Sequence, residues 1–356
     1  MLSNGGHTEF LQLLRGYDPL PGAKAALQLL RHLEVPHLFL TNGGGVVEAE
    51  KVQQLRSSLG IDVGEQQVVL AHTPLRDAAA EHKDKRVLVL GGSKTMQVAE
   101  HYGFKFANSV HDIVCHSPST YPLRPWPEPT APLAAADEAF AAVIIMYDPV
   151  DWAPDLQVAL DVIRGGDPHG SGMTQVVPVY ASNPDFVFAG RHPAPRLAQG
   201  AFTDTLKQLF FKSTGKHLQV QQVGKPSETT YAFARRALEA LPGAAASTPS
   251  HIFMVGDNPH ADIRGANNAG DPWRSLLLCS GVHSPPRVPP PAPGSVHDWQ
   301  WSEGDAHEQC SALLRAQVEL LPQAFNDSVD PAWAVSRGVL NAVLHGLHTA
   351  AQAGDA

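Results

Sequence analysis

The sequence predicts an α/β fold in which buried parallel strands alternate with helices. Short apolar runs recur along the chain, and most of them end in glycine, proline or polar turn residues before a helix-like segment begins. At residues 252–255, four apolar residues are bounded by Gly256, which suits a buried strand of a parallel sheet. With 356 residues, of which 43% are hydrophobic and 17% charged, the chain can bury a sizeable core and is expected to form two domains.

The first half of the chain contains two clear strand–turn–helix units. Residues 21–35 predict a helix, because leucines recur at helical spacing and a proline follows. Residues 38–40 predict a buried strand that ends in a glycine-rich turn, and a helix with one apolar face runs from there to Gly60. A second unit has a strand at 86–90 and a helix that ends near a glycine.

The second half repeats this pattern around two proline-rich segments. Five prolines at 122–132 and six at 284–294 predict loops. The other predicted elements are strands at 143–146, 176–180, 220–223, 252–255 and 276–279, helices around 156–163 and from Gly200, and a C-terminal helix at 333–348.

Charge and cysteine content exclude some classes of protein. The 26 Lys and Arg residues against 35 Asp and Glu give a net charge of -9, which argues against broad binding to nucleic acid or an anionic membrane. No apolar run approaches the roughly 18 residues of a membrane-spanning helix, and the first residues resemble neither a signal nor a transit peptide. Three widely spaced cysteines, Cys115, Cys279 and Cys310, favour a reducing compartment.

Two acidic residues, Asp257 and Asp262, follow the strand at 252–255. Asp257 occupies the kind of turn at which parallel sheets form ligand sites, and its carboxylate suits Mg²⁺. Asp262 lies further along, where it is expected to brace the loop or the surroundings of a metal. The other interpretation is that Asp257 only caps the following helix, and this stretch alone leaves both open.

Thr41 and Asn42 precede three glycines, residues 43–45, at the end of the strand at 38–40. Glycines permit close backbone approach to a ligand, and a hydroxyl and an amide beside a helix N-terminus suit phosphoryl oxygens. The stretch matches neither the P-loop nor the dinucleotide-binding motif. Without partners elsewhere, a plain loop is therefore the favoured interpretation.

Lys225 lies between a glycine and a proline, just before a helix that Ser227 is placed to cap. A lysine held at such a turn is a candidate phosphate clamp that acts as a point charge. For this residue alone, an exposed loop lysine is the favoured alternative. His192 and Arg196 are likewise interpreted as solvated loop residues.

Together, the three turns resemble the haloacid dehalogenase (HAD) superfamily of phosphohydrolases, in class IIA, which has a large α/β cap inserted into its core. The mitochondrial branch related to the cat eye syndrome critical region protein is the most similar. The resemblance rests on L-F-L-T-N-G-G-G (38–45), A-H-T-P (71–74), V-G-K-P (223–226), V-G-D-N-P-x-x-D-I-x-G-A-N (255–267) and S-G-V (280–282). It implies a Rossmann-like core from residues 1–80 and 201–356, with the cap at 81–200.

In that family an aspartate attacks phosphorus and a second aspartate, two residues later, acts as general acid and base. The site residues that the resemblance implies are Thr41 and Lys225 for catalysis, Asn42, Gly43 and Gly44 for substrate binding, and Asp257 and Asp262 for Mg²⁺, with Asp262 supporting the metal site. It also implies a small phosphorylated molecule as partner, a homodimer through the cap and a mitochondrial location. Because no targeting peptide is visible, a cytoplasmic location is the alternative.

The first strand departs from the family pattern. The family has D-x-D-G-x-L there, and counting back from residues 21–23 places the two aspartates at Thr8 and Phe10. Neither side chain replaces a carboxylate, so we expect the chain to be inactive or impaired and its Mg²⁺ binding to be weak or lost. Two explanations are open: a misplaced first exon, or a genuine pseudophosphatase that binds a phosphorylated ligand or a protein.

Overall fold

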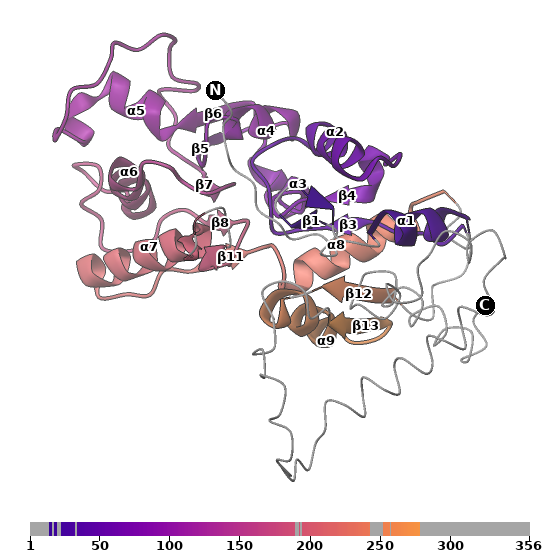
Figure 1. Cartoon of the computed structure of the whole chain (residues 1–356). Coiled ribbons are helices and arrows are strands. Elements are labelled where there is room, and N and C mark those ends of the chain that lie inside the picture. Colours follow the sequence, from indigo (N-terminus) through magenta and orange to yellow (C-terminus); the bar gives the residue numbers. More distant parts are fainter. Residues whose placement is uncertain are drawn as a thin grey trace, which may run out of the picture.

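The protein is an α/β protein, as the sequence predicts, and Figure 1 shows the computed structural model. The structure describes residues 14–15, 18–19, 23–32, 34–188, 192, 194–242, 252–256 and 258–277. The expectations for Thr8, Phe10, Asp257, the proline-rich loop at 284–294 and the C-terminal helix at 333–348 lie outside these residues. Among the described helices, none is long and apolar enough to cross a lipid bilayer.

The largest sheet has five parallel strands in the order β11-β8-β7-β5-β6. The strands are β5 (Arg86–Leu90), β6 (Phe106–Ser109), β7 (Ala142–Ile145), β8 (Val179–Ala181) and β11 (Val220–Gln222). Every residue of the central strands β5 and β7 is buried, which explains their apolar runs at 87–90 and 142–145, because both faces of a parallel sheet are covered.

Helices cover both faces of this sheet. They are α4 (Thr95–His101), α5 (Val110–His116), α6 (Trp152–Arg164) and α7 (Gln199–Thr214). Alternate strand residues Leu88 and Ile145 pack with α5, α6 and α7 in one apolar cluster, whereas Val89 and Ile144 pack with α4 in another. The five-stranded sheet contains strands on both sides of residue 200, the predicted end of the cap. The predicted domain boundaries stay a prediction.

Two pairs of parallel strands make up the rest of the described sheet structure that positions the site. β3 (Phe39–Leu40) pairs with β4 (Val68–Val69), and β12 (Ile252–Gly256) pairs with β13 (Trp273–Leu277). The helices beside them are α1 (Ala23–His32), α2 (Glu48–Leu59), α8 (Glu228–Glu239) and α9 (Arg264–Ala269). Figure 1 shows α8 and α9 beside β12 and β13.

Both strand pairs belong to the same two apolar layers. Phe39 and Val255, from different pairs, share one cluster with α1 and α2. Leu40 and Met254 share the opposite cluster with α8 and α9. The carboxyl ends of β3 and β12 therefore lie near each other, although no hydrogen-bonded ladder joins the two pairs among the described residues.

Smaller elements complete the described chain. They are the antiparallel pairs β1 (Leu14–Arg15) with β2 (Asp18–Pro19) and β9 (Val187–Phe188) with β10 (Arg196–Leu197), helix α3 (Leu75–Ala78), a π-helical turn at Pro259–Ile263, and short 3₁₀ helices at Glu65–Gln67, Ala80–His82 and Pro118–Thr120.

Two predicted strands differ from the observed ones. β8 begins only at Val179 instead of residue 176, because Pro178 has no N–H to donate to a ladder and the Val176 amide donates to Ile163 at 2.9 Å. β13 begins at Trp273, three residues before the predicted start, because it pairs along the whole of β12 from Ile252 onward.

Candidate functional site

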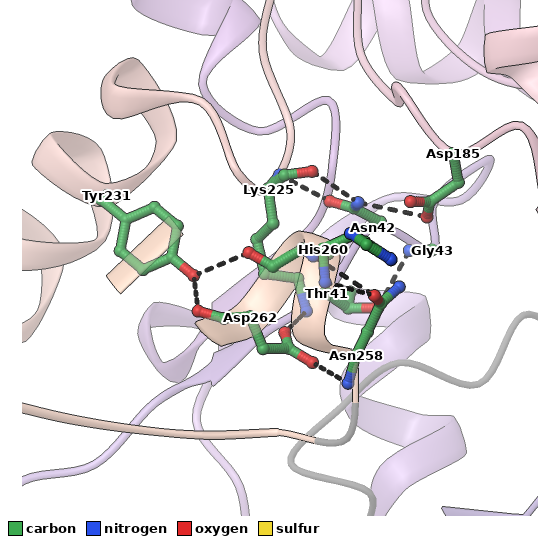
Figure 2. Close-up of polar contacts among 10 residues, drawn as sticks. Thr41, Asn42, Gly43, Asp185, Lys225, Tyr231, Asn258, His260 and Asp262 are labelled. Carbon is green, nitrogen blue, oxygen red and sulfur yellow. Dashed lines mark hydrogen bonds and ion pairs between the residues drawn. The ribbon is translucent and has the colours of Figure 1, made fainter. Parts of the chain in front are cut away.

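Three segments far apart in the sequence meet at the carboxyl end of β3 (Figure 2). They are the glycine loop, defined as residues 41–45, the turn with Lys225, and the π-helical turn with Asp262. The glycine loop continues from β3, and the Thr41 amide donates to the Val69 carbonyl at 3.0 Å. The first residue of the glycine loop is therefore hydrogen-bonded to the end of β4.

The side chains of Thr41 and Asn42 are buried, and both help to organise the loop. The amide of Gly43 donates to the Thr41 hydroxyl oxygen at 2.9 Å. Asn42 Oδ1 accepts a hydrogen bond from the Lys225 amide at 2.7 Å, while Nδ2 donates to the Lys225 carbonyl at 2.9 Å and to Asp185 Oδ2 at 3.1 Å. Asn42 thus joins the glycine loop, the lysine turn and the turn after β8.

The ammonium group of Lys225 is buried and ion-paired. Its side chain is 1% exposed, and Nζ lies 2.6 Å from Oδ1 of Asp262, whose side chain is 3% exposed. Gly224, with φ of 84°, precedes the lysine, and a Cβ there would lie 2.2 Å from the Ser182 carbonyl oxygen. Only glycine allows this close approach of the turn to the end of β8.

Asp262 accepts hydrogen bonds on both carboxylate oxygens. Oδ2 accepts from the Asn258 amide at 3.1 Å, and a Cβ at Gly256 would lie only 2.3 Å from Asp262 Cγ. The Tyr231 hydroxyl donates to the Asp262 carbonyl at 2.8 Å. Burial, and then the charge of Asp262, raise the pKa of Tyr231 well above its ordinary value, so this hydroxyl stays a donor.

The structure brings together most of the predicted site residues. Thr41, Asn42, Gly43, Lys225 and Asp262 are linked by direct or shared hydrogen bonds, and Gly44 follows in the same loop. The exposed-lysine alternative for Lys225 is wrong, because the lysine is buried together with its counterion Asp262, which lies 37 residues further along the chain. His192 and Arg196 are exposed, as predicted, although Arg196 lies in strand β10 and not in a loop.

Sequence reasoning gave no role to Asp185 and Tyr231. Asp185 lies in a polar turn after a strand, a pattern that the sequence shows, but its contact with Asn42 depends on a fold that joins residues 143 positions apart. Tyr231 reads as one apolar residue on the buried face of α8, so no sequence signal marks its hydroxyl as a partner of the Asp262 turn.

The described residues do not by themselves form a metal site. No group of three or more His, Cys, Asp or Glu side chains in the described part of the chain is arranged to hold a metal ion. Both oxygens of Asp262 accept hydrogen bonds from the protein itself, from Lys225 Nζ and from the Asn258 amide.

The fold and the site define a HAD-type hydrolase architecture, and comparisons with known proteins agree. A model of the haloacid dehalogenase-like hydrolase family matches residues 12–105, and a HAD-hydrolase-like model matches residues 222–298. The first match begins after positions 8 and 10.

The chain belongs to the haloacid dehalogenase-like hydrolases. It is 34% identical over 308 residues to the mitochondrial hydrolase YKR070W of Saccharomyces cerevisiae, a match that covers 76% of this chain and 85% of that protein. It is 33% identical over 301 residues to a cardiolipin synthase (CMP-forming) / mitochondrial hydrolase fusion protein of Schizosaccharomyces pombe, covering 81% of this chain and 50% of the fusion. The chain is thus homologous to the mitochondrial branch that its motifs indicate.

Solved structures share the fold. A putative nagD protein superposes with a TM-score of 0.55 at 19% identity, covering 78% of this chain and 88% of that one. A 4-nitrophenylphosphatase from Thermotoga maritima gives 0.52 at 19% identity, covering 74% and 81%. The fold is therefore that of the class IIA phosphatases with a cap domain.

Proposed function

We propose that the chain carries a Mg²⁺-dependent phosphomonoester site at the glycine loop and Lys225. The buried ion pair of Lys225 with Asp262 beside this loop is the observation that carries the proposal. The pair holds an ammonium group in a dry environment on a turn that is hydrogen-bonded to the glycine loop, and an ammonium group together with the amides of such a loop favours a phosphoryl group.

Each residue has a role in this proposal. Thr41 holds the phosphoryl group, and Asn42, Gly43 and Gly44 position the substrate. Lys225 neutralises the charge of the phosphoryl group, and Asp262 keeps the lysine oriented.

Asp257, outside the described residues, is the proposed ligand of Mg²⁺. When bound, the metal supplies charge neutralisation and orients the transferring group. Asp262 is the buried carboxylate that braces this turn through the Asn258 amide.

We further propose that hydrolysis is absent or weak in the chain as given. Thr8 and Phe10 stand at the positions expected to hold the nucleophile and the general acid, and neither can form an aspartyl-phosphate. The alternative function is a noncatalytic module that binds a phosphorylated ligand or a protein, favoured by the same two residues.

The proposed partner is a small phosphorylated molecule, and a homodimer through the cap is proposed with it. Relatives of this chain are named mitochondrial hydrolases, which supports a mitochondrial location. Import of the full-length protein into isolated mitochondria, followed by protease protection, tests this location. A protein that stays protease-sensitive in the soluble fraction contradicts it.

Hydrolysis of 4-nitrophenyl phosphate with Mg²⁺ tests the proposed activity. We expect little turnover by the chain as given and a gain in the variant with Thr8→Asp and Phe10→Asp, which Asp257→Asn then abolishes. Asp204→Asn, on the exposed side of α7, is the matched control and is expected to change nothing. Turnover by the unmodified chain that persists in Asp257→Asn contradicts the assignment.

Calorimetric titration with inorganic phosphate separates the two functions. Binding without turnover supports the noncatalytic module, and Lys225→Met is expected to weaken it by about tenfold or more, because a charged hydrogen bond contributes about 1.5–3 kcal/mol. Undiminished binding in Lys225→Met contradicts the proposed site.

A further inference from the structure

A buried hydrogen-bond network lies beside the glycine loop. Glu48, His72, Thr73 and Tyr102 form it, and each is at most 3% exposed. The hydroxyls of Thr73 and Tyr102 both donate to Oε1 of Glu48 at 2.6 Å. Because the single hydroxyl hydrogen of Tyr102 points to Glu48, Nδ1 of His72 donates to the tyrosine oxygen at 2.7 Å.

The network ties together three separate parts of the fold. Glu48 is the first residue of α2, three residues after the end of the glycine loop, and His72 and Thr73 belong to the A-H-T-P turn that follows β4. Tyr102 caps the carboxyl end of α4, which belongs to the five-stranded-sheet unit and lies near α2 in Figure 1. The proposed phosphate chemistry uses none of these side chains.

The charge state of this network follows from its burial. Burial alone would raise the pKa of the Glu48 carboxyl, but the hydrogen bonds from Thr73 and Tyr102 bring it below its ordinary value. Burial lowers the pKa of His72 to about 4, against the opposing effect of Glu48. Near neutral pH, the network therefore consists of a carboxylate, a phenol and a neutral imidazole.

The imidazole of His72 forms one wall of the glycine loop. A Cβ at Gly44 would lie 2.7 Å from Cδ2 of His72, so the ring is in direct contact with the loop backbone. On another side, the ring of Tyr147, which follows β7, lies against Gly45: a Cβ there would be 2.6 Å from the ring. Two rings thus confine the loop, and the Tyr102 hydroxyl sets the orientation of one of them.

We infer that Tyr102, His72 and Glu48 are positioning residues, which hold the backbone amides of the glycine loop in the arrangement that receives a phosphoryl group. This inference rests on the proposed phosphate site. The Tyr102 hydroxyl fixes the rotation of the His72 ring, and Glu48 fixes the hydroxyl. Tyr102, at the end of α4, therefore restrains the conformation of the glycine loop, although α4 is not among the segments proposed to contact phosphate.

Tyr102→Phe is the test variant, because it removes only the hydroxyl and keeps the ring packed. Tyr180→Phe is the matched control: Tyr180 is equally buried in the same unit, and its hydroxyl pairs with His82 Nε2 at 3.1 Å, away from the loop. Two quantities are measured in the full chain: the affinity for inorganic phosphate with Mg²⁺ by calorimetry, and the hydrogen exchange of the Gly44 and Gly45 amides.

In Tyr102→Phe we expect phosphate affinity to fall about fivefold and exchange of the two loop amides to accelerate about tenfold, the size expected for one lost buried hydrogen bond. Tyr180→Phe is expected to stay within about twofold of the unmodified chain in both measurements. Equal effects of the two variants, or no effect of Tyr102→Phe, overturn the inference.

Replacement of Glu48 adds a rescue test. Glu48→Gln keeps an oxygen that accepts from both hydroxyls, so affinity and exchange are expected to stay near those of the unmodified chain, whereas Glu48→Ala behaves like Tyr102→Phe. If Glu48→Gln fails like Glu48→Ala, positioning through hydrogen bonds is wrong. If the unmodified chain binds no phosphate but Tyr102→Phe still accelerates loop exchange, the proposed function fails and the positioning role stands.

Discussion

Replacing Lys225 by methionine is expected to destabilise the fold by about 3–5 kcal/mol, because it leaves a buried charge without its partner. The lysine and Asp262 side chains are 1% and 3% exposed, and their charged atoms lie 2.6 Å apart. After the substitution, the Asp262 carboxylate keeps the hydrogen bond from the Asn258 amide but loses its counterion.

A double-mutant cycle isolates this electrostatic effect. Asp262→Asn keeps an oxygen for the Asn258 amide and removes the negative charge, so adding Lys225→Met to it leaves no buried charge and is expected to cost little further stability. The free energy of unfolding is measured by urea titration with circular dichroism at pH 7. Lys207→Met is the control, because Lys207 forms an exposed ion pair with Asp204, and such pairs contribute about 1 kcal/mol or less.

Two results would refute the reasoning. A cost of Lys225→Met similar to that of the exposed control would mean that the lysine is not held in the interior by its charge. An additive cycle, in which Lys225→Met costs as much beside Asp262→Asn as it does alone, would mean that the two charges do not interact.

Two further predictions concern packing and pH. Gly265→Ala is expected to cost about 1–3 kcal/mol, because its Cβ would lie 2.2 Å from the buried Tyr231 ring; thermal unfolding checks this against Gly92→Ala, where the nearest atom is 3.7 Å away. Burial, and more weakly Asp151, raise the pKa of Asp155 from 3.8 to about 7, so the folded state retains a proton that the unfolded state loses and stability falls as pH rises between these values. The change that Asp155→Asn makes to the free energy of unfolding should therefore be about 1–3 kcal/mol more favourable at pH 8 than at pH 4, as measured by urea titration. Equal changes at the two pH values contradict this prediction.

Much of the fold was predictable because it depends on local sequence. The strands at 38–40, 86–90 and 143–146 were predicted from apolar runs, which are continuous except for Arg86, since both faces of each strand are covered. The strand that starts at 179 was predicted too long, because a proline within an apolar run looks like a strand residue until the pairing partner is known.

The sequence by itself determined which residue types stand at each strand end: the glycine loop, the lysine turn and the acidic turn after β12 are all legible as local motifs. Only the tertiary structure decided that Lys225 is buried, that Asn42 binds the lysine turn, and that Tyr102 reaches the glycine loop through His72. These contacts join residues 30 to 183 positions apart. A charged or polar side chain enters the interior only when such a partner meets it there, and its own sequence neighbourhood does not contain that partner.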